Sequence, residues 1–239
     1  MSGLRVVRWG TERLRVGPWR GDARLAYVAP LAETPAASAG MVRYCCSVLA
    51  EQGYVEVVTG ALGANEQRGF LEAGFAVREA LHLLSRPLAD LPPACAAPLH
   101  RGQRRHRADV LAIDASAFPP FWRLDQAGLD EAMAATRSAR FRVAARGRVL
   151  GYAISGRSGT KGYLQRLAVD PAVEGRGLGR ALILDGLRWM RRRGASQVVV
   201  NTQVGNERAL RLYQHLGFRL ESSGLAVLTR RLEDRELTS

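Results

Sequence analysis

The stretch Glu174-Gly175-Arg176-Gly177-Leu178-Gly179-Arg180-Ala181 joins two segments of different character. The segment before it, Leu164 to Val169, is apolar and predicts a strand, which ends at Asp170-Pro171 because proline cannot continue a ladder. The segment after it, roughly Leu178 to Arg193, is apolar on almost all sides and predicts a covered helix. A strand, a glycine-rich turn and a helix N-terminus together predict an anion site, since free backbone N–H groups converge there. The glycine spacing alone also suits a tight turn that binds nothing.

A second pattern follows downstream. Gln197 to Thr202 is a β-branched strand, and the run from Gly205 to Phe218 contains the pattern Asn-x-x-Ala-x-x-x-Tyr-x-x-x-Gly-Phe. With these two motifs in this order, the chain resembles the GNAT superfamily of acyl-CoA-dependent N-acyltransferases over about Arg107 to Leu232. The downstream run matches the family at Asn206, Ala209, Tyr213, Gly217 and Phe218.

The glycine-rich stretch matches the family's pyrophosphate loop at its two small positions, Gly177 and Gly179. Glu174 stands where the family usually has Arg or Gln. The resemblance implies an α/β fold with a mixed sheet, acetyl-CoA as co-substrate, no metal, and direct attack of an amine on the thioester. The cofactor-binding residues that it implies are Leu167, Ala168, Val169, Glu174, Gly175, Arg176, Gly177, Leu178, Gly179, Arg180, Asn206 and Tyr213.

Three roles follow from the resemblance. The amides of about Arg176 to Arg180 hold the pyrophosphate, and a backbone N–H around Leu167 to Val169 polarises the thioester carbonyl. Tyr213 matches the family's tyrosine that protonates the leaving thiolate, and a tyrosine pKa near 10 suits a general acid at neutral pH. Two plainer readings stay open: Tyr213 as a core aromatic, and Asn206 as a helix cap.

The general base is missing from the expected strand. Many family members carry a Glu there, whereas this chain has Gln165 and Arg166. Asp114 and Asp125 are weak alternatives elsewhere in the chain. An acceptor amine of low pKa, such as a protein α-amino group at about 7.7–8.0, needs less help and is therefore favoured.

The first half of the chain repeats the order of the second half. Pro30 falls opposite Pro171, and Phe70 to Phe75 falls opposite Tyr213 to Phe218. This internal duplication predicts two tandem GNAT-like units. We expect a truncated, degenerate unit over residues 1–90, a linker over 91–106 and a complete acetyltransferase unit over 107–239.

The two predicted units are not equal. Ala36-Ala37-Ser38 falls opposite the glycines of the second unit, and Phe70 replaces Tyr213. We therefore expect the first unit to brace or shape the acceptor cleft, with a second CoA site as the open alternative. A tandem arrangement of this kind also resembles mycothiol synthases, which acetylate a cysteinyl amine, although this chain is short for that group.

Two loops precede the glycine-rich stretch in the second half. Leu91 to Pro98 is rich in Pro and Ala and leads into the basic run His100 to Arg107, which we interpret as a solvated linker. The strand that opens the second unit is not located. After an early helix, Phe118-Pro119-Pro120-Phe121-Trp122 is a stiff apolar loop, either a buried plug or the acceptor pocket. Phe121 and Trp122 are the acceptor-pocket candidates.

Composition limits the functional classes. The formal net charge is +13, which attracts anions such as CoA phosphates or nucleic acid, but the basic run has no interleaved aromatics for stacking bases. The cysteines, Cys45, Cys46 and Cys95, show no metal spacing. Met1 to Arg5 lacks the apolar segment of a signal peptide, and no run is long enough to span a bilayer. A cytoplasmic protein without a membrane partner is expected.

The sequence therefore favours an N-acetyltransferase that acts on a small-molecule or peptide amine. The alternative is a catalytically silent acyl-CoA-binding or sensing protein, because Glu174 and the missing base weaken the catalytic reading. A nucleic-acid-binding protein is a remote third reading that rests on charge alone, since no reader motif is present. The oligomeric state, a homodimer included, stays open.

Overall fold

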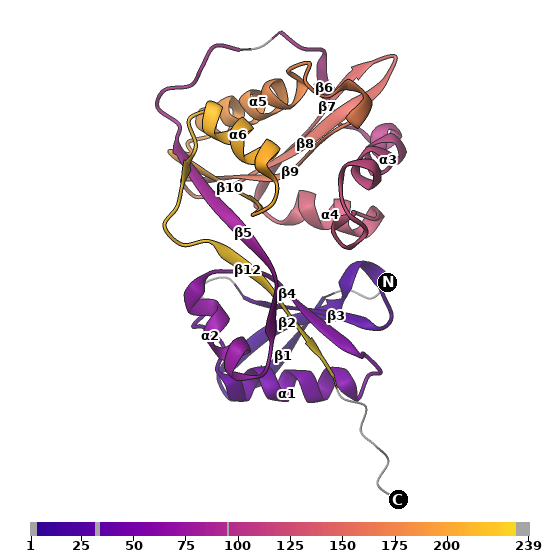
Figure 1. Cartoon of the computed structure of the whole chain (residues 1–239), viewed down its shortest axis with the longest axis vertical. Coiled ribbons are helices and arrows are strands. Elements are labelled where there is room, and N and C mark those ends of the chain that lie inside the picture. The colour runs from indigo at the N-terminus through magenta and orange to yellow at the C-terminus, as the bar shows by residue number, and fades with distance from the viewer. Residues whose placement is uncertain (1–3, 32–33, 95, 233–239) are drawn as a thin grey trace, which may run out of the picture. The chain divides into compact units, whose positions relative to one another are not determined.

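The computed structural model describes residues 4–31, 34–94 and 96–232. The chain divides into two compact units (Figure 1). The first unit comprises the described residues up to Leu83 together with Gln203–Gly205 and those from Glu221 on. The second unit comprises Leu84–Thr202 and Asn206–Leu220. Met1 to Gly3 and Cys95, which entered the sequence predictions, lie outside the described residues.

The first unit is a sheet covered by two helices. Its strands follow the order β1-β2-β3-β4-β12-β5, with β3 and β4 parallel and the other neighbours antiparallel. The helix α1 buries a face that includes both Cys45 and Cys46 against these strands. The elements are β1 (Arg5–Trp9), β2 (Glu12–Pro18), η1 (Trp19–Gly21), β3 (Leu25–Pro30), α1 (Ala39–Ala50), β4 (Glu56–Leu62), α2 (Ala64–Glu72), β5 (Ala76–Pro87) and β12 (Leu225–Arg231).

The second unit is a mixed sheet with helices on both faces. Its strands follow the order β10-β9-β8-β7-β6, and only β9 and β10 run parallel among these pairs. The elements are β6 (Leu99–Arg101), η2 (Arg104–His106), α3 (Arg107–Ala117), η3 (Pro120–Trp122), α4 (Gln126–Ala134), β7 (Ser138–Arg146), β8 (Arg148–Ser158), β9 (Lys161–Val169), η4 (Pro171–Val173), α5 (Leu178–Arg192), β10 (Gln197–Gln203), α6 (Glu207–His215) and β11 (Arg219–Leu220).

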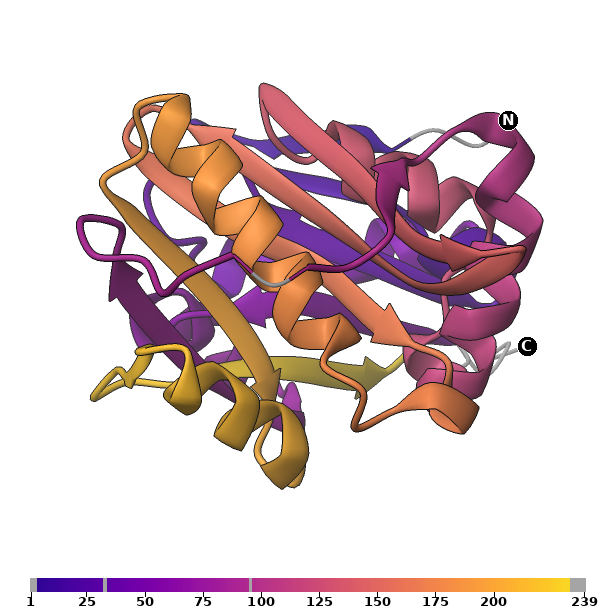
Figure 2. The same cartoon turned by 90° about the horizontal axis from the view of Figure 1, so that it is seen from above.

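Alternation along the strands sends side chains to two different cores. Ala144 of β7 and Ala153 of β8 pack on Leu182 of α5. Their neighbours Val143 and Tyr152 pack with residues of α3 and α4 on the other face. Figure 2 shows α5 running diagonally across the strands of this unit. The predicted mixed α/β fold is therefore confirmed.

The duplicated order of elements is visible in both units. Each has a pair of parallel strands joined by a long helix, β3-α1-β4 and β9-α5-β10, followed by a shorter helix. The residue after the C-cap of the shorter helix is a glycine with positive φ, Gly74 at 86° and Gly217 at 79°, where an L side chain would be strained. The aromatic pair beside that glycine is also repeated, since Phe70 and Phe75 have ring centroids 5.3 Å apart and Tyr213 and Phe218 5.5 Å.

Two features differ from the sequence expectations. The strand that could not be located is β6, within the segment interpreted as a linker, where Leu99 pairs with Ala144 and Arg101 with Arg142. The basic run is therefore partly a strand and a 3₁₀ turn rather than a free linker. The last strand, β12, was expected in the unit 107–239 but pairs with β4 and β5 in the first unit. The domain boundaries predicted from the sequence, after residues 90 and 106, stay predictions.

Candidate active site

The site begins where β9 parts from β10. Their parallel register pairs Lys161 to Tyr163 with Gln197 to Val199 and ends there. Just beyond, β9 carries a bulge, since Ser155 of β8 pairs with Leu164 and Ile154 pairs with Arg166. A bulge bends its strand and increases its twist, so it helps to separate β9 from its parallel neighbour. In the first unit the pairing of β3 with β4 runs to Val28, close to the end of β3.

A cavity of about 400 Å³ opens beyond this point in the second unit. Most of the residues predicted to bind the cofactor line it: Leu167, Ala168, Val169, Glu174, Gly175, Gly177, Leu178, Gly179, Arg180 and Asn206. The other lining residues, which the sequence did not single out for this role, are Ala117, Phe118, Val173, Arg208, Ala209 and Leu212. Arg176 and Tyr213, both predicted, are not among the described lining residues.

The glycine-rich turn has the backbone that the sequence suggested. Gly175 and Gly177 both have φ at 77°, the left-handed region that glycine adopts without a steric cost. Gly177 is the N-cap of α5, so the first amides of this helix face the cavity without a capping side chain over them. A Cβ at Gly179 would make only ordinary contacts, at 3.4 Å from Leu212 Cδ2, so packing alone does not require glycine there.

Glu174 and Arg208 form an ion pair across this cavity wall. The Nη1 atom of Arg208 donates to Oε2 of Glu174. Arg208 lies in the first turn of α6, two residues after the motif residue Asn206. The carboxylate that seemed out of place in an anion-binding turn is thus matched by a cation from another element. Sequence reasoning missed Arg208, and no local pattern distinguishes it from the other arginines of the chain.

Asn206 caps α6. Its Oδ1 accepts a hydrogen bond from the backbone N–H of Ala209 at 3.0 Å, which satisfies one of the free donors of the first turn. The cap that the sequence offered as the plainer reading is therefore present. The same residue also lines the cavity, so a cofactor contact stays a prediction.

Tyr213 is buried in the core between α6 and the neighbouring elements, with 6% of its surface exposed. Burial raises the pKa of its phenol to about 12. The ring packs on Phe218, in the arrangement that the first unit repeats with Phe70 and Phe75. Its role as a proton donor stays a prediction, because the hydroxyl does not belong to the cavity lining in this structure.

A buried polar network holds the neighbouring wall together. The carboxylate of Asp114, which has no exposed surface, accepts two hydrogen bonds from Arg166, at 2.7 Å from Nε and 2.8 Å from Nη2. It also accepts from the Tyr152 hydroxyl and, at 2.7 Å, from the backbone N–H of Leu124. Arg166 reaches further and donates to the carbonyl of Trp122 at 2.6 Å. The network joins α3, β8, β9 and the loop after α3.

The two weak candidates for a general base both have structural partners. Asp114 is held by Arg166, as described above, and Asp125 caps α4 by accepting from the N–H of Gly128 at 2.7 Å. Gln165, on the central strand, donates from Nε2 to the Thr136 hydroxyl at 3.3 Å. Its buried Oε1 has no hydrogen-bond partner among the described residues. The central strand, to which the family resemblance assigns the base, has Gln165 and Arg166 and no carboxylate over its described residues Lys161–Val169.

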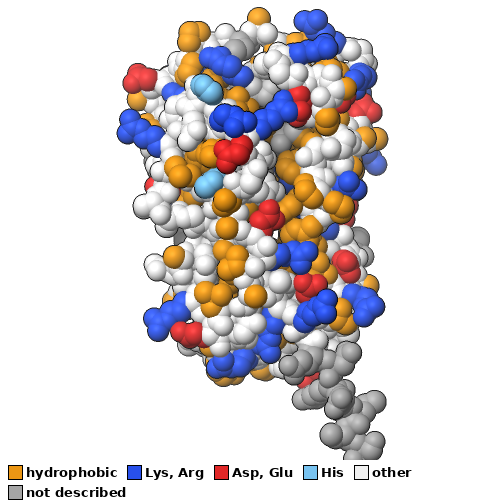
Figure 3. Space-filling model, viewed as in Figure 1, with side chains coloured by type: hydrophobic (Ala, Val, Ile, Leu, Met, Phe, Trp, Pro, Cys, Tyr) orange, Lys and Arg blue, Asp and Glu red, His pale blue; other side chains and the backbone are white. Residues whose placement is uncertain are grey.

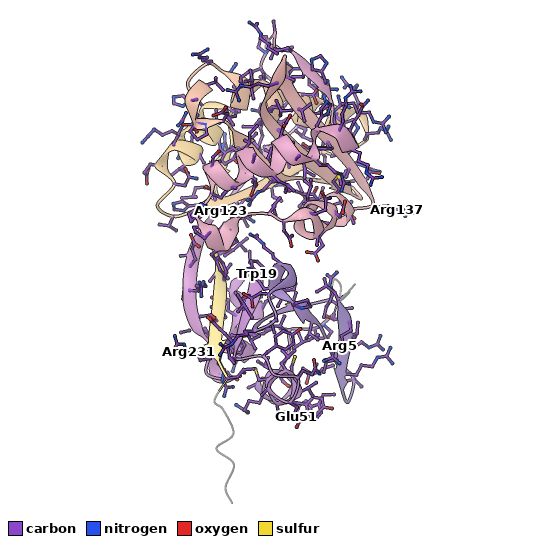
Figure 4. All side chains as sticks on the ribbon, turned by 90° about the vertical axis from the view of Figure 1, so that its right-hand side faces the viewer. Arg5, Trp19, Glu51, Arg123, Arg137 and Arg231 are labelled. Atoms are coloured by element: carbon purple, nitrogen blue, oxygen red, sulfur yellow. The ribbon has the colours of Figure 1, made fainter. Side chains whose placement is uncertain are left out.

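The apolar loop after α3 contributes Phe118 rather than its later aromatics to the cavity wall. Phe118 lines the cavity, and the Arg166 guanidinium carbon lies 3.5 Å from the centroid of its ring. Arg123, labelled in Figure 4, donates from Nε to the Phe118 carbonyl at 3.1 Å and closes the loop. Phe121 and Trp122 pack edge to face with centroids 5.0 Å apart and are not lining residues, so their acceptor role stays a prediction.

Other classes of site find little support in the described residues. Among them, no group of three or more His, Cys, Asp or Glu side chains is arranged to hold a metal ion. No helix in the described part of the chain is long and apolar enough to cross a membrane. On the face shown in Figure 3, the Lys and Arg side chains are spread among acidic ones rather than gathered in one stripe.

The chain is similar to known proteins in sequence and in fold. Residues 107–218 match the acetyltransferase (GNAT) family. The chain is 31% identical to a mycothiol acetyltransferase of Mycobacteroides abscessus, over 80% of this chain and 69% of that protein, and 32% identical to one of Rhodococcus jostii, over 84% and 73%. A solved tandem GNAT protein from the clavulanic acid biosynthesis pathway shares the fold, with a TM-score of 0.71 at 16% identity over 97% of this chain and 84% of that one. The chain belongs to the GNAT family of acetyltransferases and is an acyltransferase.

Proposed function

We propose that the second unit transfers an acetyl group from acetyl-CoA to a primary amine of a small molecule. The observation that carries this proposal is the cavity between α6 and the part of β9 beyond its pairing with β10. A pyrophosphate requires convergent N–H donors, and the glycine turn before α5 offers them at this cavity. A pantetheine arm requires backbone partners, and Leu167 to Val169 offer an edge that β10 does not pair.

The proposed reaction is a direct transfer. The nitrogen of a neutral amine attacks the thioester carbon, a C–N bond forms and the C–S bond breaks. The amine loses one proton to solvent and the thiolate of CoA gains one, so the protons balance. A backbone N–H on the Leu167 to Val169 segment polarises the carbonyl, because a fixed donor stabilises the charge that develops on the oxygen. Tyr213 is the proposed donor to the thiolate, because it stands at the position of the family's tyrosine in the downstream motif.

The acceptor is proposed from the relatives and from the loop after α3. Relatives that are named mycothiol acetyltransferase support a small-molecule amine, and a cysteinyl amine is the first acceptor to examine. Phe118, which lines the cavity, would offer an apolar wall to such an acceptor. A peptide α-amine is the second acceptor, favoured because its pKa is low enough for the neutral form to be common.

A silent acyl-CoA-binding protein is the competing function, and one observation favours it. Asp114 and Asp125, the two candidate bases that the sequence offered, are both engaged in structural hydrogen bonds. In that case the cavity would bind the donor without transferring its acetyl group.

Acetyl transfer to defined amines distinguishes the two functions. The whole chain would be incubated with acetyl-CoA and with S-methylcysteine amides, cysteinyl amines or short peptides, and N-acetylated products would be identified by mass spectrometry. Products that form faster with the protein than without it support the enzyme. Binding of acetyl-CoA without any product supports the silent protein, and the absence of both contradicts the two functions together.

A further inference from the structure

The cavity has an acidic side chain beside the place where the phosphates of the donor are proposed to bind. The charged side chains among its described lining residues are Glu174, Arg180 and Arg208. Glu174 lies in the glycine turn itself, next to the amides that are proposed to hold a pyrophosphate. A carboxylate at this place would repel a phosphate by simple Coulomb repulsion. Binding of a phosphorylated donor therefore requires a cation that offsets Glu174 and remains able to contact the phosphate.

Arg208 meets both requirements. It reaches the turn from α6, so its guanidinium joins the two walls of the cavity. Nη1 is the atom that donates to Glu174, and 59% of the arginine side chain is exposed. A guanidinium carries five N–H donors in a planar fork, so one edge can bind a carboxylate while another binds a phosphate oxygen. Lysine could not do this with the same geometry.

A purely structural role explains the pair less well. Glu174 is 32% exposed and Arg208 59% exposed, and ion pairs between such exposed side chains contribute little to stability. The pair also spans two separate elements at a cavity rather than one helix face, so it is not one of the i, i+4 pairs that occur by helix periodicity alone.

We propose that Arg208 supplies the side-chain contact to the donor's phosphates, because Glu174 stands where the family usually has Arg or Gln, and that Glu174 is its positioning residue. This inference rests on the proposed function, because it takes acetyl-CoA as the occupant of the cavity. It assigns a role to an arginine that the downstream motif spans but does not specify, since Arg208 falls between Asn206 and Ala209. In this arrangement the carboxylate of Glu174 orients Arg208 toward the phosphates.

Calorimetric binding of acetyl-CoA to the whole chain tests the assignment. Arg208→Ala is expected to weaken binding at least about tenfold, since it removes a charged contact and leaves Glu174 facing the phosphates unpaired. The matched control is Arg211→Ala, on the same helix, exposed and outside the cavity lining. Its affinity is expected to stay within about twofold of the original chain, and both variants should melt within about 2 °C of it.

The role of Glu174 is tested by a double-mutant cycle. Glu174→Gln alone is expected to change affinity by less than about threefold, because the arginine remains. Combined with Arg208→Ala, it is expected to recover part of the lost affinity, since the unpaired carboxylate has been removed. If the changes in binding free energy caused by the two single substitutions simply add up in the double variant, the positioning role is contradicted.

Binding of dephospho-CoA distinguishes a contact to the pyrophosphate from a contact to the 3′-phosphate. Dephospho-CoA lacks the 3′-phosphate, so a pyrophosphate contact predicts the same fold-loss for it as for CoA in the Arg208 variant. If Arg208→Ala weakens the binding of CoA but not that of dephospho-CoA, Arg208 contacts the 3′-phosphate instead. That result still supports a phosphate contact. If Arg208→Ala binds acetyl-CoA as well as Arg211→Ala does, the inference is wrong while the proposed function stands. If the unaltered chain does not bind acetyl-CoA, the proposed function fails and the inference with it.

Discussion

Arg166 of the central strand and Asp114 of α3 form a two-pronged ion pair inside the second unit, with N–O distances of 2.7 Å and 2.8 Å. The carboxylate is completely buried, and the guanidinium carbon lies 3.5 Å from the centroid of the Phe118 ring on the cavity wall. The central strand, on which many GNAT enzymes carry the base, thus carries here a cation that fixes the loop beside the cavity. This relationship leads to two of the predictions that follow.

Replacing Arg166 with Met is expected to destabilise the chain by about 3–5 kcal/mol, because it leaves the carboxylate of Asp114 buried without its ionic partner. Urea unfolding measures the loss. Arg107→Ala is the matched control, since its partner Asp130 is a half-exposed side chain, and about 1 kcal/mol or less is expected there. A loss for Arg166→Met no larger than that of the control would contradict the structural role of the buried pair.

The engagement of both candidate bases, Asp114 and Asp125, predicts how the transfer rate depends on pH. Glu174, the carboxylate among the described lining residues, is paired with Arg208, so the acceptor has to arrive as the neutral amine. We expect kcat/KM to rise with pH and to level off at the acceptor's own amine pKa. Two acceptors whose amine pKa values differ by about two units should therefore give inflections about two units apart. An inflection that stays at one pH for both acceptors would reveal an enzyme base.

Tyr213→Phe is expected to lower turnover about a hundredfold and to leave the affinity for acetyl-CoA nearly unchanged. The fold should tolerate the change, because the first unit already has phenylalanine, Phe70, at the equivalent place against Phe75. Single-turnover rates and calorimetry measure the two effects separately. A variant that remains fully active would remove Tyr213 from the mechanism and leave it as a core aromatic.

The two buried thiols of α1 predict a loss of stability in alkali. Burial raises the pKa of Cys45 to about 12 and that of Cys46 to about 11, from an ordinary value of 9.0. Between pH 9.0 and these values the folded chain holds protons that the unfolded chain has lost. The free energy of unfolding should therefore be unaffected by these thiols below that window and fall as the pH rises through it.

Urea unfolding at about pH 7, 9 and 10 measures this dependence, and Cys45→Ala/Cys46→Ala is the comparison. The double variant starts from a lower stability, because it removes two buried side chains, but its stability should decline less steeply between pH 9 and 10. Tyr213, whose pKa is also raised by burial, is present in both proteins, so its contribution cancels in this comparison. Equal slopes for the two proteins would show that the thiols do not contribute.

The local part of this site was predictable from sequence. The closely spaced glycines predict a turn at Gly177, and the apolar run predicts a helix from Leu178. The structure has both features. The repeat was also readable, down to the equivalence of Phe70 and Tyr213. These features depend on neighbouring residues, which a single sequence contains.

The rest depends on contacts between distant segments. The strand β6 is three residues long and forms because β7 pairs with it, so its own residues give no signal. The partners of β12 are β4 and β5, which its sequence cannot specify. Within the proline-rich loop, turn geometry decides that Phe118 rather than Trp122 reaches the cavity. The pairing of Glu174 with Arg208 likewise requires two elements to meet.

The most direct test of the central claim is a calorimetric titration of the whole chain with acetyl-CoA, in parallel with Gly177→Glu and Gly147→Glu. Both glycines have positive φ, at 77° and 72°, so the two variants carry similar strain and the same charge, but only Gly177 lines the cavity. The account predicts one site per chain, lost in Gly177→Glu and kept in Gly147→Glu. Two sites, or affinity that Gly177→Glu leaves unchanged, would contradict it.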